Sequence, residues 1–163
     1  MRVLVVGTPN FVAMQLTRAL AGRGDEVRAL LEPGRAASTH PERRLAEWQV
    51  DARPIPLSDS AGLTAAIEGM EVVYYADWRY QDWGAAEVAD QPAMRGLRNV
   101  LAAASRARVS RLIYVSTADV YGFPGEPVRE GELLAPPGLP YADARAEAEI
   151  GRASCRERVC STV

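Results

Sequence analysis

Residues 2–13, with the sequence RVLVVGTPNFVA, decide the fold class of the chain. Residues 3–6 are a short apolar, mostly β-branched run that ends in Gly7, which is typical of a strand buried on both faces. A mixture of polar and apolar residues follows over residues 11–23, and Gly24 closes it before the next apolar run. This order predicts a buried strand, a tight turn and a helix.

The rest of the chain repeats this alternation. Further strands are expected at residues 26–31, 53–57, 71–76 and 111–116, and helices at residues 41–48, 59–69 and 87–107. The alternation predicts an α/β fold with a doubly wound parallel sheet. Because ligands of such sheets bind beyond the carboxyl ends of the strands, we expect the site among the residues that follow each strand. These are residues 7–13, 32, 57–59, 77–78 and 116–121.

The charge balance excludes several classes of partner. All 19 basic residues are arginine, and 21 acidic residues leave a formal net charge of −2 over 163 residues. This balance provides no basic surface for nucleic acid and no polybasic patch for a membrane. No apolar run approaches the roughly 18 to 20 residues that cross a bilayer, so we expect a soluble, cytoplasmic protein. The single histidine, His40, has no metal-ligand spacing around it, and we expect no metal site.

Gly7, Asn10 and Ala13 have the spacing of a Gly-x-x-Gly-x-x-Gly dinucleotide-binding loop in which only the first glycine is kept. The first glycine permits the tight turn, the second lets the backbone approach the pyrophosphate, and the third allows close packing of helix on strand. Asparagine tolerates a positive φ better than most residues, and alanine is the smallest substitute with a Cβ. We therefore expect Gly7, Asn10, Phe11, Val12 and Ala13 to form a cofactor-binding turn. The alternative is an ordinary connection from strand to helix.

Three later segments occur in a characteristic order: RNVLAAA at residues 98–104, VSRLIYVSTADVYG at residues 109–122 and PYADAR at residues 140–145. Together with the preceding loop, they resemble the extended short-chain dehydrogenase/reductase family, the NAD-dependent epimerase/dehydratase group, whose members act mostly on nucleotide sugars. The resemblance covers residues 1–149. It implies a Rossmann-like fold, an NAD cofactor and hydride transfer between a substrate carbon and the nicotinamide.

The resemblance assigns catalytic roles to three residues. Tyr141 matches the tyrosine that exchanges a proton with the substrate hydroxyl, and Thr117 matches its serine or threonine partner. A tyrosine has a pKa near ~10, so it needs a nearby cation to favour the phenolate. The family places a lysine four residues after the tyrosine, on the same helix face, and Arg145 stands there in this chain. The alternative is that Tyr141 only begins a helix and that Arg145 is a solvated surface charge.

Glu32 follows the second expected strand, about twenty residues beyond the glycine loop. An acid at this position accepts hydrogen bonds from the adenosine ribose and repels a 2′-phosphate, so we expect NAD rather than NADP. Arg35 lies close by and offers the opposite preference, because an arginine there can accept that phosphate. By their places after the third and fourth strands, Leu57 and Asp77 are also expected to border the cofactor.

Several positions depart from the family pattern. Pro56 replaces an aspartate that contacts adenine, Trp78 stands where small residues are usual, and Arg145 replaces lysine. Two functions therefore stay open. The chain belongs either to an NAD(P)-dependent epimerase, dehydratase or reductase acting on a nucleotide sugar or a related hydroxyl or carbonyl compound, or to a non-catalytic sensor or scaffold that kept the fold. Members of the family often form homodimers, so a homodimer is the expected full-length assembly.

The last segment, residues 150–163, is expected to differ in origin from the rest. Residues 150–159, IGRASCRERV, match at all ten positions the in-frame translation of a common short-read sequencing adapter, and Cys160 extends the match. We therefore expect natural sequence only up to Glu149, followed by an artefactual tail. Residues 1–149 would then be an incomplete NAD(P)-binding domain, truncated before the substrate domain, and the fragment is expected to be inactive.

Resequencing of the source DNA across codons 145 to 155 tests the origin of this tail. In a library prepared without that adapter, we expect the codons after 149 to differ from the present ones. Recovery of the same codons from such a library would show that the tail belongs to the gene.

Overall fold

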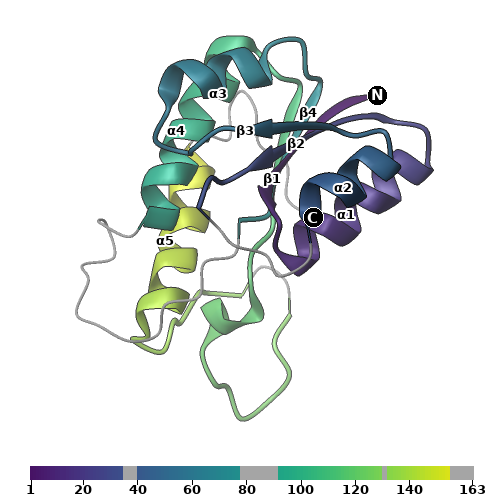
Figure 1. Cartoon of the computed structure of the whole chain (residues 1–163). Coiled ribbons are helices and arrows are strands. Elements are labelled where there is room, and N and C mark those ends of the chain that lie inside the picture. Colours follow the sequence, from purple (N-terminus) through teal and green to yellow (C-terminus); the bar gives the residue numbers. More distant parts are fainter. Residues whose placement is uncertain (35–39, 78–91, 130–131, 155–163) are drawn as a thin grey trace.

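The computed structural model describes residues 1–34, 40–77, 92–129 and 132–154 (Figure 1). Its strands are β1 (Arg2–Thr8), β2 (Glu26–Leu31), β3 (Asp51–Pro54), β4 (Val72–Tyr75) and β5 (Arg111–Tyr114). Its helices are α1 (Phe11–Gly22), α2 (Pro41–Glu47), α3 (Ser60–Ile67), α4 (Pro92–Ala107), the short 3₁₀ helix η2 (Ala118–Tyr121) and α5 (Pro140–Ser154). Of the helix predicted at residues 87–107, the first five residues lie outside the described part of the chain.

The five strands form one parallel sheet in the order β3-β2-β1-β4-β5. The chain first winds outward from β1 to β3 and then continues on the other side of β1 with β4 and β5, so the winding direction reverses between β1 and β4. Helices α1 and α2 cover one face of the sheet, and α3, α4 and α5 cover the other (Figure 1). The predicted doubly wound, Rossmann-like α/β fold is therefore confirmed.

β1 lies at the centre of the sheet and is buried on both faces. Leu4 and Val6 pack into the core beneath α3, α4 and α5, whereas Val3 and Val5 pack into a second core beneath α1 and α2. Because successive side chains of a strand point to opposite faces, a strand covered on both sides needs apolar residues at every position. This is the physical reason that the run at residues 3–6 predicts the fold.

β3 covers residues 51–54, whereas the sequence predicted a strand at residues 53–57. The predicted bounds are therefore wrong by about half a strand. Its register with β2 pairs Asp51 with Arg28 and Pro54 with Leu31. A proline has no N–H to donate to a ladder, so the pairing ends where Pro54 and Pro56 enter the sequence. The residues that follow β3 are therefore free to turn toward the carboxyl ends of the other strands.

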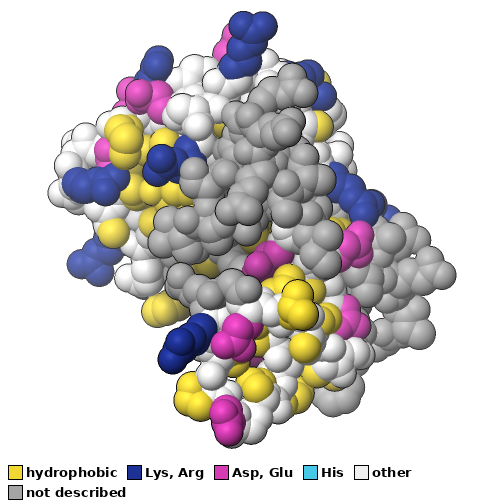
Figure 2. All heavy atoms as spheres, turned by 180° about the vertical axis from the view of Figure 1, so that it is seen from behind, with side chains coloured by type: hydrophobic (Ala, Val, Ile, Leu, Met, Phe, Trp, Pro, Cys, Tyr) yellow, Lys and Arg dark blue, Asp and Glu magenta, His cyan; other side chains and the backbone are white. Residues whose placement is uncertain are grey.

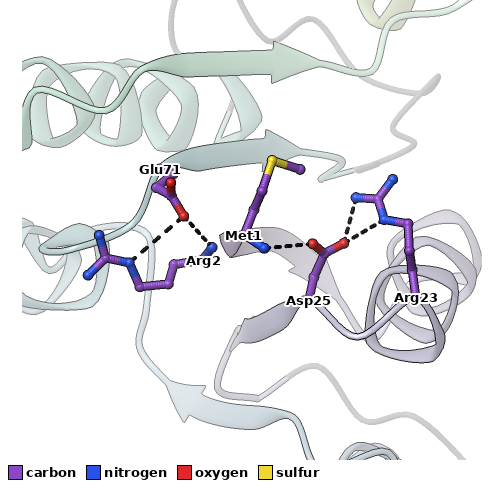
Figure 3. Close-up of polar contacts among 5 residues, drawn as sticks. All are labelled: Met1, Arg2, Arg23, Asp25 and Glu71. Atoms are coloured by element: carbon purple, nitrogen blue, oxygen red, sulfur yellow. Dashed lines mark hydrogen bonds and ion pairs between the residues drawn. The ribbon is translucent and has the colours of Figure 1, made fainter.

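The amino-terminal edge of the sheet carries two sets of ionic contacts (Figure 3). The Met1 ammonium donates to Oδ1 of Asp25 at 2.9 Å, and Nε of Arg23 donates to Oδ2 at 2.7 Å. Beside them, Oε2 of Glu71 accepts the backbone N–H of Arg2 at 2.7 Å. Hydrogen bonds from the ammonium and from Arg23 hold the pKa of Asp25 below its usual value of 3.8. The ionised form of Asp25 therefore stabilises the folded chain.

We expect the Asp25→Asn variant to be less stable than the wild type near neutral pH, with the difference shrinking as the pH falls below about 4. A carboxyl group whose pKa is lowered by folding contributes stability above its unfolded pKa, and this contribution is lost as the pH falls through its folded pKa. Thermal melts of both proteins from about pH 7 down to about pH 3 measure the difference. A difference that stays constant over this range would contradict the role of these contacts.

Candidate functional site

A pocket of about 170 Å³, its open mouth included, lies at the carboxyl ends of the central strands. It is lined by Gly7, Thr8, Leu30, Glu32, Leu57 and Asp77. These residues come from the ends of β1 and β2 and from the segments after β3 and β4, so they flank the point at which the winding reverses. The structure thus brings together four residues that the sequence places beside a cofactor: Gly7, Glu32, Leu57 and Asp77.

Gly7 sits where two backbones meet beside this pocket. Its φ is +119°, and a Cβ at this position would lie 2.5 Å from the carbonyl carbon and oxygen of Ala76 and 2.6 Å from the amide nitrogen of Asp77. A glycine is therefore needed both for the backbone conformation and for the close approach of the two chain segments. The contact joins the end of β1 to the residues directly after β4.

Asn10 has a different role from the one expected at the second glycine of the loop. It has a φ of −66° and a ψ of 161° and is the N-cap of α1. Its Oδ1 accepts the backbone N–H of Ala13 at 2.8 Å, and its Nδ2 donates to the carbonyl of Ala76 at 2.6 Å. An N-cap residue takes an extended conformation, so Asn10 does not use the positive φ that asparagine tolerates. Asn10 instead ties the start of α1 to the end of β4.

The first turn of α1 offers backbone donors next to the pocket-lining residues. The N–H groups of Phe11 and Val12 lie in this turn, where an α-helix supplies no acceptor of its own. The Phe11 side chain is 75% exposed, whereas Ala13 is fully buried against the sheet. The small Ala13 side chain thus serves the close packing expected of the third loop position. Chemically, the turn can attract an anionic group through its N–H donors and the helix dipole.

The backbone of Leu57 is held by hydrogen bonds at both its N–H and its carbonyl. Oε2 of Glu32, after β2, accepts the Leu57 N–H at 3.1 Å, and Nδ2 of Asn99, on α4, donates to the Leu57 carbonyl at 2.8 Å. Helix α4 comes close enough because residue 96 is glycine, where a Cβ would lie 2.8 Å from Cδ1 of Leu57. Sequence reasoning assigned no role to Asn99, although a polar residue within an apolar helical stripe was the available signal.

Thr117 is the N-cap of η2. Its Oγ1 accepts the Asp119 N–H at 3.3 Å, and its hydroxyl donates to Oδ2 of Asp119 at 2.9 Å. The hydroxyl of Ser116, the preceding residue, is buried without a hydrogen-bond partner in the described part of the chain. Helix α5 packs against η2, and Tyr141 lies in the first turn of α5. The fold thus brings the elements of Thr117 and Tyr141 together, while the Tyr141 side chain lies outside what the structure describes.

Arg145, four residues further along α5, is buried with only 5% of its surface exposed. Its Nη1 donates to the Tyr114 hydroxyl at 2.8 Å, and its Nη2 donates to the carbonyl of Asp77 at 2.6 Å. The guanidinium carbon also lies 5.5 Å from the centroid of the Tyr114 ring, a cation–π distance. The alternative of a solvated surface arginine is therefore wrong, because α5 turns this side chain inward.

The segment between η2 and α5 exposes apolar side chains. Four large apolar residues of this segment are exposed: Phe123, Val128, Leu133 and Leu139. Figure 2 shows hydrophobic side chains gathered with acidic ones on the lower part of the molecule. The segment is anchored by a hydrogen bond of 3.0 Å from the Ala135 N–H to the Val120 carbonyl. An apolar surface thus lies close to the 3₁₀ helix that Thr117 caps.

Two sequence-predicted positions, Arg35 and Trp78, lie outside the described residues. Within the described ranges, no three histidine, cysteine or acidic side chains gather so that they could hold a metal ion. None of the helices in those ranges is long and apolar enough to span a membrane.

The sheet is parallel and doubly wound, and a pocket lies at the point of reversal beside the N-terminus of α1. These features define a Rossmann-like α/β protein, a fold class that binds dinucleotides. The sequence model of the NAD dependent epimerase/dehydratase family matches residues 3–160. The chain belongs to this family.

Two curated relatives resemble the chain over most of its length. It is 28% identical over 149 residues to a 3 beta-hydroxysteroid dehydrogenase/Delta 5→4-isomerase of Mycobacterium tuberculosis, an alignment that covers 87% of this chain and 37% of the relative. It is 29% identical over 160 residues to a 2-alkyl-3-oxoalkanoate reductase of Stenotrophomonas maltophilia, covering 98% of this chain and 46% of the relative. The chain thus spans less than half the length of these relatives.

Solved structures share the fold. The UDP-glucuronic acid 4-epimerase of Bacillus cereus, in complex with UDP-glucuronic acid and NAD, matches with a TM-score of 0.79 at 18% identity, covering 99% of this chain and 55% of that one. At this identity the likeness shows the fold alone.

We expect Gly7→Ala to lower the free energy of unfolding by at least about 2 kcal/mol. The added Cβ would meet backbone atoms of Ala76 and Asp77, which can move only together with the end of β4, and alanine is strained at a φ of +119°. Gly22→Ala is the matched control, because a Cβ there has no neighbour within 4 Å. Urea unfolding of the three proteins measures the effect. If Gly7→Ala were as stable as Gly22→Ala, the close contact would be refuted.

Proposed function

We propose that the chain forms the dinucleotide-binding side of an NAD-dependent epimerase, dehydratase or reductase that moves a hydride between the nicotinamide and a hydroxyl- or carbonyl-bearing carbon. One observation carries this proposal: the β1–α1 turn, Glu32 and Leu57 surround a single pocket at the reversal point of the sheet. This is where α/β folds of this kind bind dinucleotides.

The residues present fit parts of such a cofactor. The N–H groups of Phe11 and Val12 would face the pyrophosphate, because helix N-termini favour anions. The Glu32 carboxylate would accept hydrogen bonds from the adenosine ribose, since a carboxylate accepts more bonds than the one it receives from Leu57. The remainder of the dinucleotide would lie along the open carboxyl ends of the strands.

The chemistry would be divided between the cofactor and the chain. When bound, the nicotinamide accepts or donates the hydride. Tyr141 would exchange the proton of the substrate hydroxyl, and the Thr117 hydroxyl would hydrogen-bond the same oxygen. The positive charge of Arg145 would favour the phenolate form of Tyr141, because a nearby cation lowers the pKa of a tyrosine.

The names of the relatives support a proposal for the substrate class. By their names, the curated relatives act on a hydroxysteroid and on a 2-alkyl-3-oxoalkanoate, and the epimerase of known structure binds a UDP-sugar. We therefore propose a small molecule with a secondary alcohol or ketone, of which a nucleotide sugar is one form. A homodimer for the full-length protein rests on the family resemblance alone.

The alternative of a non-catalytic sensor or scaffold is less well supported, because the curated relatives named above carry enzyme names. Cofactor binding distinguishes the two functions. An enzyme of this family needs to bind a nicotinamide dinucleotide, whereas a scaffold does not.

We expect the chain to bind NADH more tightly than NADPH in fluorescence titrations, and Glu32→Gln to reduce this preference by about tenfold. Glutamine keeps an oxygen that can accept the Leu57 N–H but removes the charge that would repel a 2′-phosphate. Glu47→Gln is the control, because this acid lies on the exposed end of α2 in an ion pair with Arg43. An unchanged preference in Glu32→Gln would refute the role of Glu32, and a lack of binding of either dinucleotide at millimolar concentration would refute the proposed function.

A further inference from the structure

Arg145 connects α5 to the residue that lines the pocket after β4. We propose that Arg145 is a positioning residue, which fixes the Asp77 peptide at the wall of the dinucleotide pocket. This inference rests on the proposed function for its ligand, but the contacts that carry it belong to the chain itself.

The inward direction of Arg145 follows from the composition of α5. Four alanines of this helix are buried, each at most 4% exposed: Ala142, Ala144, Ala146 and Ala148. Alanines let the helix lie close against its neighbours, and Ala144 and Ala148 join the core formed with α3 and α4. A buried charge is unfavourable unless it is hydrogen-bonded. Arg145 meets this requirement with acceptors on two different segments of the sheet.

The guanidinium bridges the ends of two neighbouring strands. Nη1 reaches the hydroxyl of Tyr114, the last residue of β5, and Nη2 reaches the carbonyl of Asp77, two residues after β4. Tyr114 is itself fixed, because its ring stacks on that of Tyr75 with the centroids 5.9 Å apart and the planes at 24°. The planar guanidinium has its donors in a rigid arrangement, so it sets the distance and angle between the two acceptors.

The Asp77 peptide is also where the pocket meets α1. The carbonyl of Ala76 accepts from Asn10 of α1 at 2.6 Å, and the next carbonyl, that of Asp77, accepts from Arg145 of α5 at 2.6 Å. Helices α1 and α5 lie on opposite faces of the sheet (Figure 1). Two consecutive carbonyls are therefore held from opposite sides, and Gly7 packs against the peptide that joins Ala76 to Asp77. Loss of one of these two hydrogen-bond donors would let the backbone at the pocket wall shift toward the face of the sheet on which the other donor lies.

Lysine is not equivalent to arginine in this position. An ammonium is a compact point charge, whereas the two contacts of Arg145 use separate nitrogens of a planar group. If Arg145 acted only by its charge, Arg145→Lys would preserve its function. If Arg145 positions the Asp77 carbonyl, a lysine at this position does not preserve that function.

The test compares NADH affinity in Arg145→Lys and in Arg28→Lys at a temperature at which both variants are folded. Arg28 is the matched control, because it also donates to a carbonyl, that of Ala66 at 2.7 Å, and to a side chain, Asp51 at 2.8 Å, but it does not line the pocket. We expect Arg145→Lys to weaken NADH binding by about tenfold and Arg28→Lys to change it by less than about twofold. Equal affinity in Arg145→Lys and wild type, or an equal loss in both variants, would overturn the proposal.

A second readout needs no dinucleotide. We expect the amide hydrogens of Ala76 and Asp77 to exchange faster in Arg145→Lys than in Arg28→Lys. The Asp77 carbonyl has then lost its hydrogen-bond donor, so the backbone directly before it opens more easily. Tyr114→Phe removes one acceptor but keeps the ring, and we expect the same change to a smaller extent. Unchanged exchange in both Arg145→Lys and Tyr114→Phe would overturn the positioning role even if NADH binds. If exchange rises but wild type binds no NADH, the positioning holds and the proposed function fails.

Discussion

The close contact between Gly7 and the Ala76–Asp77 peptide is the constraint on which the rest of the site depends. β1 and β4 are neighbours at the reversal point of the sheet, and their ends can approach this closely only because residue 7 has no Cβ. The approach brings the Ala76 carbonyl within reach of Asn10, which in turn begins α1 at Phe11. The direction of the helix and the shape of the pocket therefore follow from one backbone contact.

The sequence predicted the sheet well because its signal is local. The apolar run at residues 3–6 of β1 is typical of a strand buried on both faces, and glycines and prolines mark the turns. The site was predicted in its location but not in its details. The contact of Asn10 with the end of β4, the burial of Arg145 and the role of Asn99 each depend on a partner far along the chain: Ala76, Asp77 and Leu57. No spacing rule encodes such a partner.

A chain whose only strong cations are arginines uses them as connectors as well as charges. Arg28 joins β2 to Asp51 on β3 and to the end of α3, and Arg145 joins α5 to the ends of β4 and β5. In both places a carbonyl oxygen is one of the acceptors. A guanidinium stays protonated at all ordinary pH values and presents several donors in a plane. The connections to carbonyl oxygens therefore hold independently of pH, in contrast to the contacts with the carboxylates of Asp51 and Asp25.

The arrangement around Leu57 limits how this side of the pocket can recognise a ligand. Its N–H is already bonded to Glu32 and its carbonyl to Asn99, and Pro56 before it has no N–H at all. Free backbone donors are therefore absent from this stretch of two residues. A ligand that needs hydrogen-bond donors would have to receive them from the opposite side of the pocket, where the first turn of α1 begins.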